Sequence, residues 1–212
     1  MHKVLDFIKK NKQFSFFLLL VILLALITIF APVIAPQDPY ASDLKNALQP
    51  PSSAHWFGTD KLGRDIFSRV IYASRSSLPA TLILVVLIFA IGTLLGTLAG
   101  YFGGWIDAVI MRISDMMISF PGMVLAIAVA GIMGASVKNA VIAVAVVSWP
   151  KYARLARSLV MKIRHEDYIY AAIVTGSKTS YILRKYMLPN IIPTLIITAA
   201  TDIGGMMLEL AG

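Results

Sequence analysis

Long apolar stretches alternate with short polar segments along this chain. Residues 14–34 and residues 76–106 carry no charged side chain. A helix rises 1.5 Å per residue, so about 20 apolar residues cross a hydrocarbon core of about 30 Å. The pattern predicts an all-α integral membrane protein in which five membrane spans can be counted: residues 14–34, about 78–101, 116–136, 138–157 and 190–212.

Composition supports this fold class, since 58% of the residues are hydrophobic, only 14% are charged, and the mean hydropathy is +0.78. Ordinary soluble domains are about 45–50% apolar. We interpret residues 14–34 as an uncleaved anchor, because this apolar run is longer than the core of a signal peptide. The absence of cysteine excludes disulfides and thiol chemistry.

The net charge of +8 could indicate a nucleic-acid partner, but the positions of the cations argue against it. If residues 1–13 are cytoplasmic, the segments on that side hold most of the 19 lysines and arginines. The positive-inside rule therefore predicts a cytoplasmic N-terminus. The cations then face the cytoplasm and the membrane lipid.

The segment at residues 35–77 is predicted to be an extracytoplasmic loop that ends in a short helix. Several prolines disfavour regular helix in its first part, and Asp65 is placed to cap a helix that runs to Ser74. Trp56 and Phe57 are typical of an interfacial anchor, and a receptor-facing element is the alternative. In the following span, the fourfold spacing of Gly92, Gly96 and Gly100 predicts close helix packing, either static or sliding.

No constellation of residues predicts catalysis or a metal site. Asp202 and Glu209 are the candidates for function, because ionisable groups inside a membrane span are costly. The two residues are seven positions apart and therefore share one helix face. Asp202 could line a translocation path together with Glu209, or it could form an inter-helix hydrogen bond, to a partner subunit or to Ser and Thr hydroxyls. Met206 and Met207 could be soft-metal ligands, but packing is the commoner role of methionine.

In the cytoplasmic segment at residues 151–185, Arg154 and Arg157 are followed by Lys162 and Arg164, so the fourth helix leaves the membrane with a basic end that suits lipid phosphates. A short helix over residues 168–175 is predicted to stop at Gly176. A second helix is capped by Ser177 or Thr179 and ended by Pro189. Two short helices joined at a glycine would form a compact knob that can receive force from another protein.

Four motifs occur in order: WFGTDKLGRDIFSRVIYASRSSL at residues 56–78, RISDMMISFP at 112–121, WPKYARLARS at 149–158 and YAAIVTGSKTSYILRKYMLP at 170–189. With them the chain resembles the second permease subunit of bacterial peptide and nickel ABC importers over nearly its whole length. The last motif resembles the EAA loop of such permeases, although Tyr170 stands where the family has glutamate. The resemblance implies a loop over residues 166–189 that docks an ATPase through five residues: Ala171, Ala172, Gly176, Leu188 and Pro189.

The resemblance further implies a non-catalytic permease in the bacterial inner membrane, with residues 78–212 forming the permease domain. Its expected partners are a second permease subunit, two ATP-binding subunits that use ATP and Mg, and an extracytoplasmic substrate-binding protein. No cofactor is expected on this chain, and a sixth span of the family is expected after Gly212. The cargo would be nickel, a metal chelate or a di- or oligopeptide, and residues 203–212 favour the nickel branch. The alternatives are a stand-alone secondary transporter or channel using Asp202 and Glu209, and a membrane scaffold.

Overall fold

The computed structural model describes residues 10–211, and all regular structure among them is helical. Contacts divide the chain into two units, Met1–Leu78 and Pro79–Gly212, which are described separately. Helices α2 (Lys12–Ile34) and α3 (Ile66–Phe102) are long and apolar enough to cross a membrane, as is the helical stretch Thr179–Ala211. A fourth crossing is possible if α4 (Gly104–Ile118) and α5 (Gly122–Met133) form one bent span.

In the first unit, α2 is followed by a loop with a single turn of 3-10 helix, η1 (Leu44–Asn46). The loop is organised by three buried polar residues, Thr59, Asp65 and Ser68. One carboxylate oxygen of Asp65 accepts hydrogen bonds from the backbone N–H of Ser68 at 2.8 Å and from its hydroxyl at 2.6 Å. The predicted cap by Asp65 at the start of α3 is thereby confirmed.

The helix after Asp65 is longer than predicted. The short helix expected up to Ser74 and the span expected from about residue 78 form one continuous helix, α3, of 37 residues. No glycine interrupts the junction, and the hydroxyls of Ser74 and Ser76 bond to carbonyls of the preceding turn, at Ile71 and Ala73. Pro79 lies inside α3. The expectation of two separate elements was therefore wrong.

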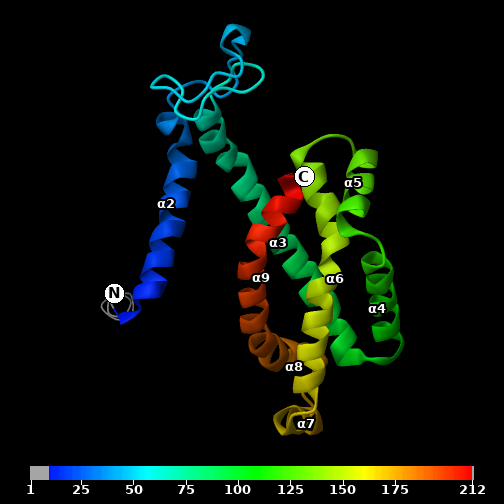
Figure 1. Ribbon diagram of the computed structural model, residues 1–212. Helices are drawn as coiled ribbons and strands as arrows, with labels where there is room; N and C mark the ends of the chain where they lie inside the picture. Colours follow the sequence, from blue (N-terminus) through cyan, green and yellow to red (C-terminus); the bar gives the residue numbers. More distant parts are fainter. Residues whose placement is uncertain (1–9, 212) are drawn as a thin grey trace. The chain divides into compact units, whose positions relative to one another are not determined.

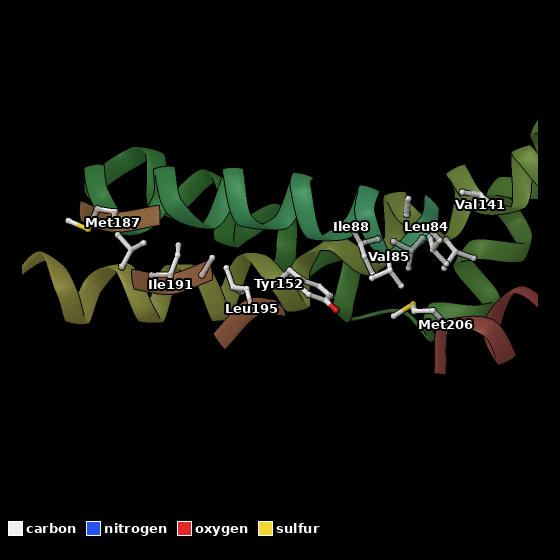
Figure 2. Packing of buried hydrophobic residues seen from close by; sticks show 14 of the residues in the cluster. Leu84, Val85, Ile88, Val141, Tyr152, Met187, Ile191, Leu195 and Met206 are labelled. Atoms are coloured by element: carbon white, nitrogen blue, oxygen red, sulfur yellow. The ribbon is translucent and has the colours of Figure 1, made fainter. Parts of the chain in front are cut away.

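The second unit is built around α6 (Val137–Arg164), which contains more buried residues than the helices that flank it. Helices α4 and α5 pack along α6, and so does α9 (Leu188–Ala211) (Figure 1). Figure 2 shows the apolar cluster of this unit, in which Leu84 and Ile88 of α3, Tyr152 of α6 and Ile191 and Leu195 of α9 are fully buried.

The glycine face of α3 is a contact surface for α6. A Cβ atom on Gly96 would lie 2.2 Å from the carbonyl oxygen of Ala153, and one on Gly92 would lie 2.4 Å from Cβ of Tyr152. On Gly100 it would lie 2.8 Å from the carbonyl oxygen of Arg157. Only glycine permits this approach of the two backbones, so the predicted close packing is confirmed.

The stretch expected as one span over residues 116–136 is divided between α4 and α5, which meet at an angle of 93°. The break follows from Pro121, because the residue before a proline is disfavoured in the α region and Pro121 itself, with ψ of 116°, is not helical. Gly134, with φ of +89°, then ends α5. The third span is therefore not a single straight helix.

Beyond α6 come α7 (Asp167–Val174), α8 (Thr179–Ile182), the π-helical turn η2 (Leu183–Met187) and α9. The prediction that Pro189 ends a helix was wrong, because Pro189 lies in the first turn of α9 and helix runs without a gap from Thr179. In η2 the N–H of Leu188 donates to the carbonyl of Leu183, five residues back. This wider turn accommodates a proline that has no N–H to donate.

Candidate functional site

Helix α7 and its flanking turns, residues 166–178, form a projecting element at the end of α6 that we call the α7 knob (Figure 1). Ile169 and Ala172 are buried and belong to the apolar cluster of the second unit. On the opposite face Tyr170, Ile173 and Val174 are exposed, Val174 by 87%. The knob is thus anchored on one side and presents an apolar surface on the other.

Helix α7 is stopped at Gly176, which has a left-handed backbone with φ of +78°. Its N–H donates to the carbonyl of Ile173, and the N–H of Ser177 donates to the carbonyl of Ala172, both at 3.0 Å. This pair of bonds is a Schellman motif, which favours glycine at the left-handed position. The predicted stop at Gly176 is confirmed. The next helix, α8, has Lys178 at its N-cap and no side-chain capping bond, so the predicted cap by Ser177 or Thr179 was wrong.

The five residues expected to dock an ATPase divide into two groups. Ala171, Ala172 and Gly176 lie in the knob, where Ala172 is buried and the other two are exposed. Leu188 and Pro189 lie at the start of α9, and Leu188 packs against the same cluster as Ala172. Their role in docking stays a prediction.

Asp202 forms an ion pair with α6. Nζ of Lys151 lies 2.7 Å from both carboxylate oxygens, and the hydroxyl of the buried Tyr152 donates to Oδ2 of Asp202 at 2.9 Å. The Asp202 side chain is only 14% exposed. Of the two readings drawn from the sequence, this geometry favours the contact with a neighbouring helix.

Glu209 lies apart from this ion pair. It lines a small pocket of about 100 Å³ with Ser148 of α6 and with residues of α5 that include Gly122 and Ala126. Met206 is buried in the apolar cluster, which supports the packing role of this residue. Whether either acidic residue lines a translocation path stays a prediction.

Two further ion pairs tie α6 to α4. Arg157 binds both carboxylate oxygens of Asp107, at 2.5 Å each. Arg154 donates to Asp115 at 2.5 Å and to the hydroxyl of the buried Ser114 at 3.2 Å. Arg154 and Arg157 thus hold carboxylates, and the suitability of the basic end of α6, with Lys162 and Arg164, for lipid phosphates stays a prediction. Sequence reasoning missed the pairs, although the threefold spacing of Lys151, Arg154 and Arg157 places all three cations along one side of α6.

Comparison with known proteins identifies the family of this chain. Residues 92–212 match the profile of the family described as "Binding-protein-dependent transport system inner membrane component". The chain belongs to this family. Residues 2–51 also match the N-terminal transmembrane domain of oligopeptide transport permease C. The family assignment that the sequence motifs suggested is confirmed, together with the all-α membrane fold class.

Three relatives cover most of this chain. The probable D,D-dipeptide transport system permease protein of Escherichia coli (strain K12) is 45% identical over 91% of the chain and 64% of the relative. The dipeptide transport system permease protein of Alkalihalophilus pseudofirmus is 43% identical over 96% of the chain and 67% of the relative. The nickel transport system permease protein of Escherichia coli (strain K12) is 38% identical over 92% of the chain and 70% of the relative. The chain thus spans about two thirds of the length of these relatives.

As a member of this family, the chain is a multi-pass protein of the inner membrane and a transport component. The family is a non-catalytic membrane component of transport systems, so the ion pairs of α6 are explained by structure or by transport. Among residues 10–211, no group of three or more His, Cys, Asp or Glu side chains could hold a metal ion.

Proposed function

We propose that this permease forms half of the translocation pore of an ATP-driven importer and receives the motion of an ATPase through the α7 knob. The observation that carries the proposal is that α7 is buried on one face and exposed on the other. Its inner face, at Ile169 and Ala172, is locked into the core, and its outer face, at Tyr170, Ile173 and Val174, is exposed and apolar. Such a surface fits a protein partner.

The packing behind the knob supports transmission of force. Ile169 and Ala172 share one apolar cluster with Val160 of α6 and with Met187 and Ile191 next to and within α9. A displacement of α7 would therefore move the ends of α6 and α9 together, because a close-packed interior transmits strain. Alternating access would follow if closure of the motor subunits tilts these helices.

The proposed complex contains a second permease subunit, two ATP-binding subunits that hold ATP and Mg, and an extracytoplasmic substrate-binding protein. In this arrangement the α7 knob and the N-terminus are cytoplasmic. The basic residues of residues 151–189 lie on that side, in agreement with the positive-inside rule. No cofactor is proposed for this chain.

For cargo, we propose a short peptide, with nickel or a nickel chelate as the second candidate. Two of the relatives above are named for dipeptide or D,D-dipeptide transport and one for nickel transport. The relatives named for peptides have the higher identities. If Glu209 lines the path, its carboxylate would suit the ammonium group of a peptide.

The experiment compares Val174→Asp with a matched control, Leu44→Asp. Leu44 is also exposed, by 71%, but lies in the first unit, on the loop predicted to be extracytoplasmic. The tagged chain is purified from native membranes in mild detergent, and copurifying proteins and ATPase activity are measured. We expect an ATP-binding subunit to copurify with the wild type and with Leu44→Asp. It should be lost with Val174→Asp, although the amount of chain inserted in the membrane is unchanged.

Two results would overturn the proposal. One is equal recovery of the ATP-binding subunit with both variants, which would remove the knob from the docking surface. The other is uptake of a dipeptide into proteoliposomes by the purified chain alone. That result would favour a stand-alone transporter, in which Asp202 and Glu209 supply the coupling site.

A further inference from the structure

An apolar groove runs between α3 and the helical turns that precede α9. It has a volume of about 410 Å³ and lies wholly within the second unit. Its walls are mostly apolar, with Phe89, Leu94 and Leu98 from α3 and Leu183 and Leu188 from the other side. Leu94 is 61% exposed, so the groove opens to the surface of the chain.

Two hydroxyls in this groove have no partner. Thr93 and Thr97 both line it, and they are 7% and 4% exposed. Among the described residues, their Oγ1 atoms are the buried side-chain polar atoms without a hydrogen bond. Buried polar groups are normally hydrogen-bonded, so these two hydroxyls in the wall of the groove are donors left unsatisfied within the described residues.

One end of the groove carries positive charge. Ser180 and Arg184 line it there and also line an adjoining open pocket of about 720 Å³. Lys178, Lys185 and Tyr181 complete that pocket with Ser177 and Tyr186. No acidic residue lines it, and within residues 10–211 no ion pair engages Lys178, Arg184 or Lys185. These cations differ in this respect from Lys151, Arg154 and Arg157, each of which holds a carboxylate.

We propose that this groove binds one anionic phospholipid. The acyl chains would lie along Leu94, Leu98 and Leu188. The ester carbonyls would accept hydrogen bonds from Thr93 and Thr97, and the phosphate would lie on Arg184 and Lys185. Apolar walls, unpartnered donors and unpaired cations together match what the chains, the esters and the phosphate of a phospholipid require.

The apolar wall and the cations beside it favour a phospholipid, which carries acyl chains and a phosphate in one molecule. A protein helix with an acidic residue is the competing occupant, and the cross-linking test below separates the two. The proposal does not depend on the cargo, and its test measures neither uptake nor ATPase activity. Leu188 is the one residue lining the groove that is also among the five expected to dock an ATPase.

The test measures lipid binding by native mass spectrometry on the full chain purified with its copurifying subunits. Dioleoyl phosphatidylglycerol is titrated against dioleoyl phosphatidylcholine, which has the same acyl chains and no net charge. Arg184→Gln is compared with Lys162→Gln, which removes an equal charge from an exposed position of α6 outside the groove. We expect Arg184→Gln to lower the affinity for phosphatidylglycerol about fivefold and Lys162→Gln to leave that affinity unchanged.

A second variant keeps the proposal testable if Arg184→Gln does not fold. The double variant Thr93→Val with Thr97→Val removes both hydroxyls at constant shape. It should lower the affinity for both lipids, because both carry ester carbonyls. Equal effects of Arg184→Gln and Lys162→Gln would overturn the proposal. Displacement of phosphatidylglycerol by millimolar inorganic phosphate would also overturn it, in favour of a simple anion site.

The remaining competitor is the second permease subunit. The chain contains no cysteine, so Leu94→Cys introduces a unique thiol at the mouth of the groove. In native membranes, we expect this thiol to react with a lipid-soluble maleimide and to form no cross-link to another subunit. A cross-link in high yield would show a subunit interface and overturn the lipid assignment.

Discussion

Lys151 of α6 and Asp202 of α9 form an ion pair in which one ammonium group lies 2.7 Å from both oxygens of the carboxylate. The pair joins two helices that are 51 residues apart in sequence and that pack along each other. The hydroxyl of Tyr152 donates to the same carboxylate. Asp202 is therefore held in place by α6, whatever part it has in transport.

We expect replacement of either partner to lower the thermal stability of the permease. Asp202→Asn leaves Lys151 without its carboxylate, and Lys151→Met leaves Asp202 without its cation. The coupling between the two should be about 1 kcal/mol, as for polar contacts between membrane helices, and Lys151 is 56% exposed. A double-mutant cycle by thermal unfolding in detergent measures it. If the losses of stability in the single variants simply add in the double variant, the two groups do not interact. Glu209→Gln is the control, and we expect it to change thermal stability least.

Gly96 should not tolerate a methyl group. In Gly96→Ala the new Cβ would lie 2.2 Å from the carbonyl of Ala153 and 2.8 Å from Cβ of Ala156, so α3 and α6 must separate. Overpacking of this kind costs about 1–3 kcal/mol. Gly204→Ala is the matched control, because a Cβ at Gly204 of α9 meets nothing within 4 Å. Thermal unfolding of the two variants should show a loss for the first alone, and equal melting temperatures would refute the close contact.

Gly176 should be sensitive to backbone conformation and insensitive to size. A Cβ there meets no atom within 4 Å, but φ is +78°. A β-branched residue in this region costs about 1–3 kcal/mol, whereas asparagine adopts it more readily. We therefore expect Gly176→Val to loosen the α7 knob and Gly176→Asn to preserve it. Hydrogen exchange at Ser177, whose N–H closes the turn, reports the difference. Equal exchange in both variants would contradict the strained-turn explanation.

The loop of the first unit should open in acid. Desolvation raises the pKa of the Asp60 carboxyl. Hydrogen bonds from the side chain and backbone of Arg64 and from the backbone of Leu62 outweigh this effect and lower the pKa to about 2. Burial also raises the pKa of Asp65, and hydrogen bonds from Ser68 and His55 outweigh this effect and leave it below its ordinary value.

Because the folded pKa of Asp60 lies below its ordinary value of 3.8, its stabilising effect is complete above about pH 4 and is lost as the pH falls towards 2. Pepsin cleavage of the loop measures this opening. At pH 4 we expect the wild type to resist cleavage and Asp60→Asn to be cut, and at pH 2 we expect both to be cut. Equal resistance of the two proteins at pH 4 would count against the role of Asp60.

The sequence alone predicted the features that depend on local chemistry. Apolar runs indicated three of the five expected spans, which correspond to α2, α3 and α9. Asp65 was predicted as a cap from its position before an apolar pattern, and Gly176 as a stop from its place after one. The four motifs gave the family. The spacing of Gly92, Gly96 and Gly100 predicted a contact face but could not name α6 as its partner.

Tertiary structure decided what depends on residues distant in sequence. The partners of Lys151, Arg154 and Arg157 lie 39 to 51 residues away, and a cation that suits a lipid phosphate suits a carboxylate equally well. Pro189 could be expected to stop a helix because proline removes a donor, yet the π-helical turn η2 carries the helix past it. Local sequence sets which interactions each side chain can make, and only the packing of α3, α6 and α9 selects the ones that form.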